Sequence, residues 1–496
     1  AYLAWAQALA GQLRAALGHP EPWTKTLPRV HVELGNEIWN SAGYWWCGFK
    51  GPDYWSNMFA LAKASAYYTN TVIFHSAGQN FSASMANQVI RDAPTGDRYS
   101  IAPYVLSSLN TTDLSLNNTD DKFYRWLFGY PLHTTYSNGM PQHYAVMTNR
   151  STEYSVYEFN HHTTGGSAGY NDVNKFVASA GAGVSIINTM LALLKQYGIR
   201  SQCLFNFLQR DFDAYSLGTP GRVWLWGVTR DTRAGSVRHR PTGLGFIVAN
   251  RVLGGDLVTT THTGDNPAFT ANGYFRSETG VKTYTWPTLH SYAFRDGARR
   301  ALIIVNFDLW SNQTVSVRFP AGEGALAATA STWYTAASYV SNHNETLTAP
   351  PLVTIAAAGL TAFTNGVLVS IPPFTIQSFE WQAATNPQNP SVMINNGALT
   401  TVVPGVTLTL HADSPDPAQM QVSESASFAG AVWTNHLESL AWELSHGEGM
   451  RTVYARFRTS GGALSDTASA HITLVPEPGL LLWLAALAGG CALSRH

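Results

Sequence analysis

The sequence is poor in charge, and this scarcity narrows the range of partners. Charged residues make up 12% of its 496 residues, and 30 Lys+Arg are balanced by 31 Asp+Glu. A surface that binds nucleic acid needs a basic face or a run of like charge, and neither is present. We therefore expect no nucleic-acid partner.

Cysteine is also scarce, with single residues at Cys47, Cys203 and Cys491. An odd number of widely spaced cysteines predicts neither a disulfide framework nor a zinc site. His161 and His162 are adjacent, but adjacent side chains rarely present both rings to one ion, and no spaced carboxylate completes a ligand set. The sequence therefore predicts no metal and no cofactor. Substrate hydrogen bonding or plain loop structure is the expected role of these histidines.

Long apolar runs are absent except at the C-terminus, where no charge occurs from Gly479 to Ser494. At about 16 residues this stretch is short for a membrane span of ~20. Pro-Glu-Pro at 476–478 precedes it and Arg495 follows it. This order resembles the PEP-CTERM sorting signal of Gram-negative bacteria. The resemblance implies a secreted or cell-surface protein whose tail, 475–496, is processed by an exosortase-type enzyme; the alternative is a buried C-terminal helix.

Helix-like and strand-like segments alternate through residues 1–254. The chain opens on AYLAWAQALAGQLRAAL, without Met, which predicts an amphipathic helix over 1–18. Further helices are predicted over 56–70, 174–198 and 242–253. Five short apolar segments are predicted as strands: RVHVELGN, TVIFHSA, YSIAPYVL, YSVYEFN and SQCLFNFL.

Strands separated by helices predict parallel β/α units that are buried on both faces. Five such strands would suit strands four to eight of a TIM-like α/β barrel, so the barrel is expected to be truncated at its N-terminus. Open edges would expose unpaired backbone groups. On this interpretation the isolated chain is expected to be poorly soluble and inactive.

The pattern changes after residue 254. Short alternating Thr/Val-rich segments, such as those at 282–296 and 374–382, predict an all-β sandwich over 255–383. A polar, proline-bearing linker follows at 384–391. Another run of short strands then predicts an immunoglobulin-like module over 390–475. A spacer or adhesion role is expected for this module, and carbohydrate binding is the alternative.

Two of the predicted barrel strands end close to a glutamate. Glu37 follows one strand in VELGNEIWN, and Glu158 lies at the end of another in SVYEFNHH. Catalytic groups of β/α barrels stand at the C-terminal ends of strands. Cleavage of a glycosidic bond needs two carboxyl groups, one protonated and one ionised. The pair therefore indicates glycoside hydrolysis, although either residue could instead be a structural or loop acid.

Gly-Asn-Glu after one strand, with a second glutamate about 120 residues later after another, resembles clan A of the glycoside hydrolases, and its arabinofuranosidase-like and xylosidase-like branches most. The resemblance covers about 1–382 and implies a barrel with an added β-sandwich. It implies that Glu37 is the acid/base, that Glu158 is the nucleophile and that Asn36 contacts the substrate 2-hydroxyl. It further implies that Tyr104 hydrogen-bonds the nucleophile.

Other residues are weaker candidates for substrate binding. His75 could line the barrel mouth or be a buried histidine with satisfied hydrogen bonds. Trp39 and Trp224 could stack on a sugar ring or could simply pack in the core, and the same holds for Trp45 and Trp226. The predicted function is that of a retaining glycosidase acting on a polysaccharide or oligosaccharide. The alternative is a non-catalytic surface or matrix protein that binds glycans.

Overall fold

A computed structural model describes most of the chain. The predicted helix over 1–18, the candidate residues Asn36, Glu37 and Trp39, and the tail from 477 onward lie outside the described residues. The described ranges are 27–33, 52–65, 68–78, 82–92, 95–149, 152–209, 211–213, 222–232, 237–318, 329–336, 339–360, 367–383, 386–413, 417–459 and 462–476.

Five parallel strands form one sheet whose spatial order follows the chain, β1-β2-β3-β4-β5. Each strand lies within or next to a segment where the sequence predicts one, so the parallel β/α arrangement is confirmed. Within the described residues the sheet forms a half-barrel. The strands are β1 (Val30–Glu33), β2 (Val72–Ala77), β3 (Arg98–Ile101), β4 (Glu153–Phe159) and β5 (Ser201–Leu204).

The two faces of this sheet differ in polarity because side chains alternate along each strand. On one face Phe74, Tyr99 and Val156 are buried in the main apolar core. On the other face Ser100 lies beside Ser155 in register. The helices cover the apolar face, as their shared core shows. The polar face is the one that a closed barrel would enclose.

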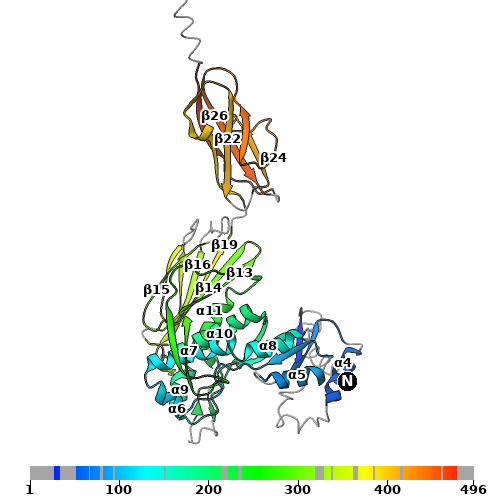
Figure 1. The fold of residues 1–496 in the computed structure, drawn as a ribbon, viewed down its shortest axis with the longest axis vertical. Helices are drawn as coiled ribbons and strands as arrows, with labels where there is room; N and C mark the ends of the chain where they lie inside the picture. Colours follow the sequence, from blue (N-terminus) through cyan, green and yellow to red (C-terminus); the bar gives the residue numbers. More distant parts are fainter. Residues whose placement is uncertain are drawn as a thin grey trace, which may run out of the picture.

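The helices alternate with the strands as β/α units require, and α10 and α11 lie directly beneath the β-sandwich (Figure 1). The sequence analysis predicted no helix over 83–92 or 111–149. Most of α7 is buried, so it lacks the polar stripe that makes a helix recognisable. The helices are α4 (Pro52–Lys63), α5 (Ala83–Asp92), α6 (Thr111–Leu116), α7 (Asp120–Tyr136), α8 (Met140–Asn149), α9 (Tyr170–Val177), α10 (Ala180–Tyr197) and α11 (Pro241–Asn250).

The single helix predicted over 174–198 is wrong, because two helices, α9 and α10, meet there. Ser179 is in an extended conformation between them, and its hydroxyl accepts a hydrogen bond from the Ala182 N–H at 3.1 Å. A serine in this position satisfies a free amide at the start of α10 and so favours a new helix. Helix α10 then ends at Gly198, whose left-handed φ of 66° suits glycine.

Short strands connect β5 to α11, and a β-sandwich follows. Its largest sheet has the order β10-β13-β14-β19-β16-β17, and two hairpins, β11-β12 and β15-β18, accompany it. The elements are β6 (Phe212–Asp213), β7 (Arg222–Val223), β8 (Thr229–Asp231), β9 (Arg238–His239), β10 (Asp256–Val258), β11 (Ala268–Tyr274), β12 (Val281–Pro287), β13 (Leu289–Asp296), β14 (Arg299–Asn306), β15 (Gln313–Val317), β16 (Thr329–Ala336), β17 (Val353–Leu360), β18 (Val367–Ile371) and β19 (Thr375–Gln382).

The strand segment predicted over 282–296 is divided between two sheets. Strand β12 pairs with β11, whereas β13 pairs with β10 and β14. The break follows Pro287, which has no N–H to donate to a continuing ladder. The hairpin of β11 and β12 instead lies against α7, where the Trp126 indole N–H donates to the Tyr274 carbonyl at 3.0 Å.

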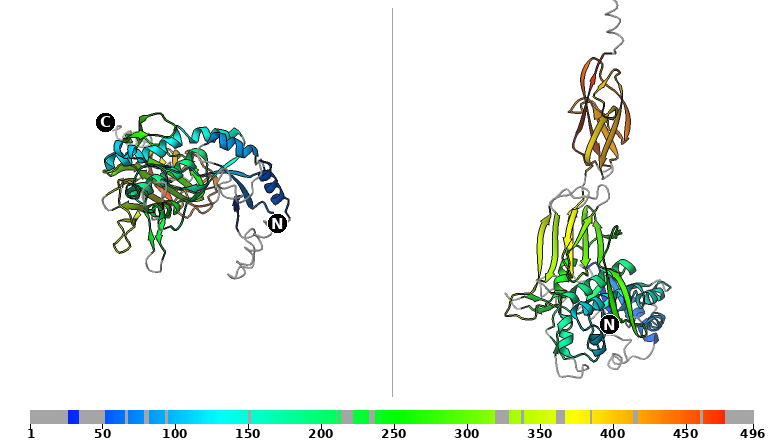
Figure 2. Two further views of the ribbon diagram at one scale, coloured as in Figure 1. Left: turned by 90° about the horizontal axis from the view of Figure 1, so that it is seen from below. Right: turned by 60° about the vertical axis from the view of Figure 1, so that its left-hand side comes forward.

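The last part of the chain forms two further sheets around a separate apolar core that includes Leu408, Met420 and Phe457. It stands beyond the β-sandwich along the long axis of the molecule (Figure 2). Its first strand begins at Gln388, inside the segment predicted as linker; the immunoglobulin-like assignment stays a prediction. The elements are β20 (Gln388–Ile394), η2 (Asn395–Gly397), β21 (Thr400–Thr401), β22 (Gly405–Asp413), β23 (Gln419–Ser423), β24 (Thr434–Asn435), β25 (Ser439–Glu443), β26 (Gly449–Arg458) and β27 (Ala468–Leu474).

Within the described part of the chain, no helix combines the length and the apolar composition that crossing a bilayer requires.

Candidate active site

Two of the residues predicted from the sequence meet at the C-terminal edge of the five-stranded sheet, the edge formed by the C-terminal ends of its strands. The loops after β3 and β4 run side by side, since the Val105 N–H donates to the Asn160 carbonyl at 2.9 Å. The Tyr104 hydroxyl in the first loop donates a hydrogen bond to Oε2 of Glu158 near the end of β4. Both side chains are half-buried.

An irregularity in β4 coincides with Glu158. Val156 pairs with Gln202 and Phe159 pairs with Leu204. Between these two pairs β4 has two residues, 157 and 158, whereas β5 has one, Cys203. One extra residue in a strand is a β-bulge, which redirects the neighbouring side chains. The bulge therefore helps to set the direction in which Glu158 leaves the sheet.

The contact between Tyr104 and Glu158 has a chemical consequence. A hydrogen bond that is donated to a carboxylate favours its ionised form. An ionised carboxylate at a strand end can attack an electrophilic carbon or can stabilise a developing positive charge. The arrangement is therefore suited to a nucleophile, and less suited to a proton donor.

Aromatic side chains pack beside Tyr104, the residue that donates to this carboxylate. The His162 ring lies 4.5 Å from the Tyr104 ring, and 5.5 Å from the Trp226 ring, between centroids. The Trp226 indole N–H donates to the His161 carbonyl at 2.9 Å. Its φ of 81° lies in the left-handed region, which is costly for a bulky residue and clusters at functional sites. Flat rings beside a carboxylate are the usual lining of a sugar site.

Trp224, the tryptophan that the sequence analysis favoured, has other surroundings. Its backbone N–H donates to Oδ1 of Asn174 at 2.8 Å. Its ring lies 5.1 Å from the ring of His343, in the segment between β16 and β17. The structure therefore groups Trp226, rather than Trp224, with Tyr104 and Glu158. The sequence signal for both was the same, since they are two residues apart in RVWLWGV.

The loop that carries Trp226 is fixed by a buried ion pair that the sequence analysis did not anticipate. Arg240 donates to both carboxylate oxygens of Glu345, at 2.5 and 3.1 Å. Its remaining N–H groups donate to the carbonyls of Gly227 at 2.7 Å and Gln209 at 3.0 Å. Because Gly227 directly follows Trp226, this arginine holds the backbone of the site from behind.

His75 lies within the sheet, on the polar face. Its Nδ1 lies 2.5 Å from the Ser100 Oγ and 2.9 Å from the Ser155 Oγ, and its Nε2 lies 2.7 Å from Nδ1 of His31. Burial first, and then the charges of His31 and Arg98, lower the pKa of His75 to about 4. The structure thus places a neutral His75 in a hydrogen-bonded group that crosses four strands, and its role in substrate binding stays a prediction.

The adjacent pair His161 and His162 point to different surroundings. His161 is fully buried, with its ring edge against Phe176 at 5.3 Å, and burial lowers its pKa to about 3. His162 faces Tyr104 instead. In the described ranges, no group of three or more His, Cys, Asp or Glu side chains is arranged to hold a metal ion.

Comparisons with known proteins agree with this architecture. No family model and no curated protein matches the sequence. Among solved structures, an α-L-arabinofuranosidase from Thermotoga maritima, in an arabinose complex, has a TM-score of 0.51 at 16% identity, covering 75% of this chain and 69% of its own. Two family 51 α-L-arabinofuranosidases are also similar. The enzyme from Thermotoga petrophila has a TM-score of 0.50 at 16% identity, covering 75% of this chain and 69% of its own. The enzyme from Bifidobacterium longum has a TM-score of 0.50 at 13% identity, covering 75% of this chain and 70% of its own.

At these identities the likeness shows the fold alone. It confirms that a parallel α/β barrel arrangement followed by a β-sandwich is the architecture of this part of the chain. The activity has to be argued from the side chains at the C-terminal edge of the sheet.

Proposed function

We propose that this protein is a retaining glycoside hydrolase with Glu158 as its nucleophile. The observation that carries the proposal is the Glu158 carboxylate at the C-terminal end of β4, which accepts a hydrogen bond from Tyr104, whose ring in turn packs beside His162. A barrel fold alone supports many chemistries. A strand-end carboxylate that accepts a hydrogen bond, which favours the ionised form, supports attack on an anomeric carbon as the chemistry of this site.

The proposed reaction has two displacements. An oxygen of Glu158 forms a bond to the anomeric carbon while the glycosidic C–O bond breaks, and Glu37 donates its proton to the departing oxygen. Glu37 then removes a proton from water, whose oxygen attacks the same carbon and releases Glu158. The role of Glu37 rests on its sequence motif, and a retaining mechanism requires its carboxyl group to be ~5–5.5 Å from that of Glu158.

The substrate is proposed to be a polysaccharide or an oligosaccharide. The similar structures are described as α-L-arabinofuranosidases, which makes α-L-arabinofuranosides the first substrates to test. Asn36 is proposed to contact the substrate 2-hydroxyl, since an amide can donate and accept at once. We further propose that the tail directs the protein to the cell surface through an exosortase-type enzyme, with the last β-rich part as a spacer.

The function is tested on the protein expressed from its complete gene, with the tail removed. Aryl arabinosides, xylosides, glucosides and galactosides are assayed with the wild type and with Glu37→Gln and Glu158→Gln. Hydrolysis of one sugar by the wild type, lost in both variants, is the expected result. Well-folded protein that cleaves neither the aryl glycosides nor polymeric substrates would contradict the proposal and favour a glycan-binding surface protein.

A further inference from the structure

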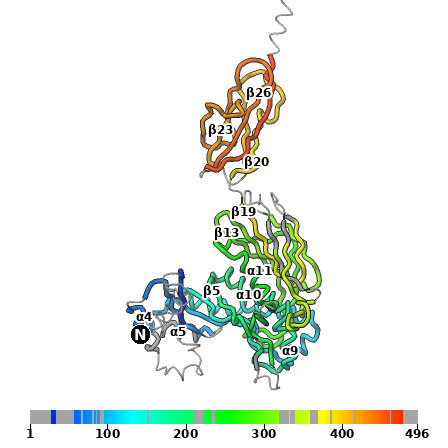
Figure 3. The backbone as a smooth tube through the Cα atoms, turned by 180° about the vertical axis from the view of Figure 1, so that it is seen from behind, coloured from blue at the N-terminus to red at the C-terminus, as the bar shows by residue number. Residues whose placement is uncertain are grey.

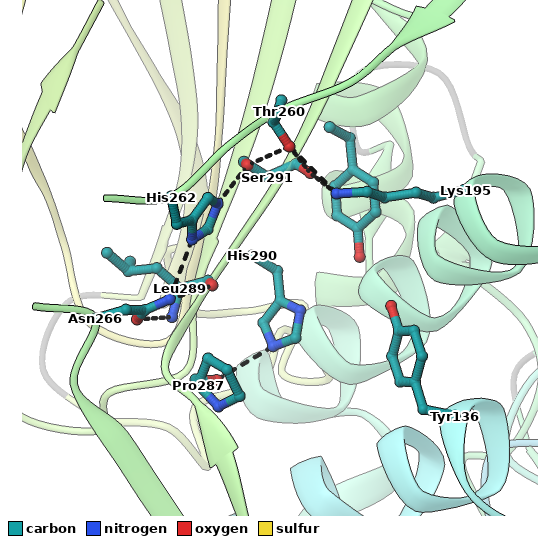
Figure 4. A pocket seen from close by; sticks show the side chains of 10 residues that line it. Tyr136, Lys195, Thr260, His262, Asn266, Pro287, Leu289, His290 and Ser291 are labelled. Atoms are coloured by element: carbon teal, nitrogen blue, oxygen red, sulfur yellow. Dashed lines mark hydrogen bonds between the residues drawn. The ribbon is translucent and has the colours of Figure 1, made fainter. Parts of the chain in front are cut away.

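A polar cavity of about 270 Å³ lies away from the candidate active site. Tyr136, at the end of α7, and Lys195, in the last turn of α10, line it together with residues of the segment 260–266, the end of β12 and strand β13 (Figure 4). Helix α10 leads into the start of β5, so its last turn lies at the N-terminal edge of the five-stranded sheet. Figure 3 shows α10 between β5 and the β-sandwich. The cavity therefore lies on the side of the N-terminal edge, opposite to Glu158, and its lining comes from the helices and the β-sandwich.

The direction of each hydrogen bond in this cavity can be derived from Asn266. Its Oδ1 accepts from the Leu289 N–H at 3.1 Å, and its Nδ2 donates to the Leu289 carbonyl at 3.1 Å. The backbone of one residue thus fixes the orientation of the amide. Its Nδ2 also faces the Nδ1 of His262 at 3.1 Å. Because Nδ2 can only donate, Nδ1 of His262 must be the acceptor.

The donors of the remaining hydrogen bonds, from His262 through Ser291 to Thr260, can now be assigned. With Nδ1 unprotonated, His262 carries its proton on Nε2 and donates to the Ser291 hydroxyl at 2.6 Å. That hydroxyl donates to the Thr260 Oγ1 at 2.9 Å, and Thr260 donates to the Ser291 carbonyl at 3.2 Å. Burial and the charge of Lys195 lower the pKa of His262, in agreement with a neutral ring. His262 therefore adds no positive charge to the cavity.

Lys195 is the cation of this cavity. Its ammonium donates to the Thr260 Oγ1 and to the Ser291 carbonyl, both at 3.2 Å, and both acceptors are neutral. The ammonium also lies 5.5 Å from the centroid of the Tyr292 ring, a weak cation–π distance, so its third N–H group can still reach a ligand acceptor in the cavity. No Asp or Glu is among the described residues that line the cavity. Partial burial lowers the pKa of Lys195, while the residue as a whole is exposed and therefore accessible to a ligand.

The cavity also offers a neutral acceptor. The His290 Nε2 donates to the Pro287 carbonyl at 3.2 Å, which leaves Nδ1 as an acceptor. Burial lowers the pKa of His290 to about 4, so the ring is neutral at pH 7. The Tyr136 hydroxyl reaches the same space (Figure 4). A ligand that uses all these groups needs an anionic oxygen for Lys195 and hydroxyl groups for His290 and Tyr136.

We propose that this cavity binds one hydroxylated carboxylate, with the chemistry of a uronic acid. Its carboxylate would accept from Lys195, and its ring hydroxyls would bond to His290 and Tyr136. Sites for small molecules usually measure ~300–1,000 Å³, so a cavity of this size suits a single sugar ring better than a longer chain. The proposal does not depend on Glu158 or on the hydrolytic activity.

The test measures binding of D-glucuronate, D-glucose and sulfate at pH 7 by calorimetry. Glucuronate is expected to bind at least about tenfold more tightly than either glucose, which lacks the carboxylate, or sulfate, which lacks the hydroxyl pattern. Lys195→Met is expected to weaken glucuronate binding at least about tenfold. Lys282→Met, which removes an exposed lysine on β12, is expected to leave it unchanged.

Three outcomes would overturn the proposal. They are no binding of glucuronate, sulfate binding as tight as that of glucuronate, and unchanged glucuronate binding in Lys195→Met. Should Lys195→Met fail to fold, Lys195→Gln replaces it, because its amide can still donate to Thr260 or Ser291 while lacking the charge. A polymer containing uronic acid units, tested beside the free acid, separates a site for a chain end from one for the free sugar.

Discussion

The two edges of the five-stranded sheet contain opposite chemistry. At the C-terminal edge, Glu158 receives a hydrogen bond from Tyr104 among aromatic rings. At the N-terminal edge, Lys195 is held by Thr260 and Ser291 beside two neutral histidines. In β/α barrels the C-terminal face carries catalysis, and the N-terminal face is usually structural. The comparison shows that the side of the N-terminal edge also presents a functional group to a cavity, a lysine whose hydrogen-bond acceptors are both neutral.

The largest effect on activity is expected for a substitution at the C-terminal edge. Glu158→Gln is expected to reduce kcat by roughly 10⁴-fold or more, because an amide cannot form the covalent bond to sugar. Steady-state kinetics on the best aryl glycoside measure it. Glu153→Gln is the matched control, since Glu153 begins the same strand and pairs with Arg98 at 2.5 Å. Equal losses in both variants would indicate damage to β4 and would argue against a catalytic role for Glu158.

The second prediction concerns the support behind the C-terminal edge. Glu345→Gln leaves Arg240 and Arg230 without their carboxylate in a buried setting. Removing one partner of a buried ion pair typically costs about 3–5 kcal/mol. Chemical denaturation monitored by tryptophan fluorescence is expected to show this loss.

The control for this prediction is Glu380→Gln, in the half-buried pair with Arg299. Its cost is expected to be about 1 kcal/mol or less, because exposed or partly exposed pairs contribute little. Similar costs for the two variants would mean that the Arg240–Glu345 pair does not position the Trp226 loop more strongly than an ordinary pair.

Tyr104→Phe tests the hydrogen bond at the C-terminal edge more gently. The ring stays, while the hydroxyl that favours the ionised carboxylate is lost. Activity is expected to fall by roughly 10–100-fold, and the acidic limb of the pH–rate profile is expected to move to higher pH. An unchanged profile at reduced activity would show that Tyr104 acts only through packing.

The smallest expected effect concerns pH and two buried histidines, His75 in strand β2 and His161 in the loop after β4. The pKa of His75 is lowered to about 4 and that of His161 to about 3, against an ordinary value of 6.5. Below pH 6.5 the unfolded chain therefore binds more protons than the folded one. The stability that these neutral histidines contribute is therefore fully present above pH 6.5 and is lost as the pH falls toward 4.

His161→Leu removes one of these groups and is expected to flatten the decline in melting temperature by roughly 2–4 °C between pH 6.5 and 4. Circular dichroism at several pH values measures it. The exposed His446, replaced by Gln, serves as the control and is expected to leave the slope unchanged. An equally steep decline in His161→Leu would mean that this histidine is not the group that takes up protons.

A feature of the fold or of the site could be predicted from the sequence where its pattern lies within one short segment of the chain. The strands β1 to β5 were found because short apolar runs between helices are a local pattern. Glu158 was proposed because strand ends are where barrels carry catalytic groups, and Tyr104 because of the resemblance to clan A. The structure brings the two side chains into contact, and their catalytic roles stay predictions. The break at Ser179 was also visible in principle, as a capping residue inside a helical run.

The missed features depend on contacts between distant segments. The bulge opposite Gln202 depends on how β4 meets β5. The role of Arg240 depends on Glu345, 105 residues away. The Lys195 cavity joins the end of α10 to strand β13, whose pairing the sequence does not show. Helix α7 was missed because burial on most sides removes its amphipathic pattern.

The most direct test of the central claim is to trap the covalent intermediate on Glu158. The protein from its complete gene is incubated with an activated 2-deoxy-2-fluoro glycoside of its preferred sugar, and its peptides are analysed by mass spectrometry. A retaining enzyme with this nucleophile is expected to carry one sugar on the peptide that contains Glu158, and none after the substitution Glu158→Gln. Label on another carboxylate, or turnover without any label and with inversion at the anomeric carbon, would contradict the assignment.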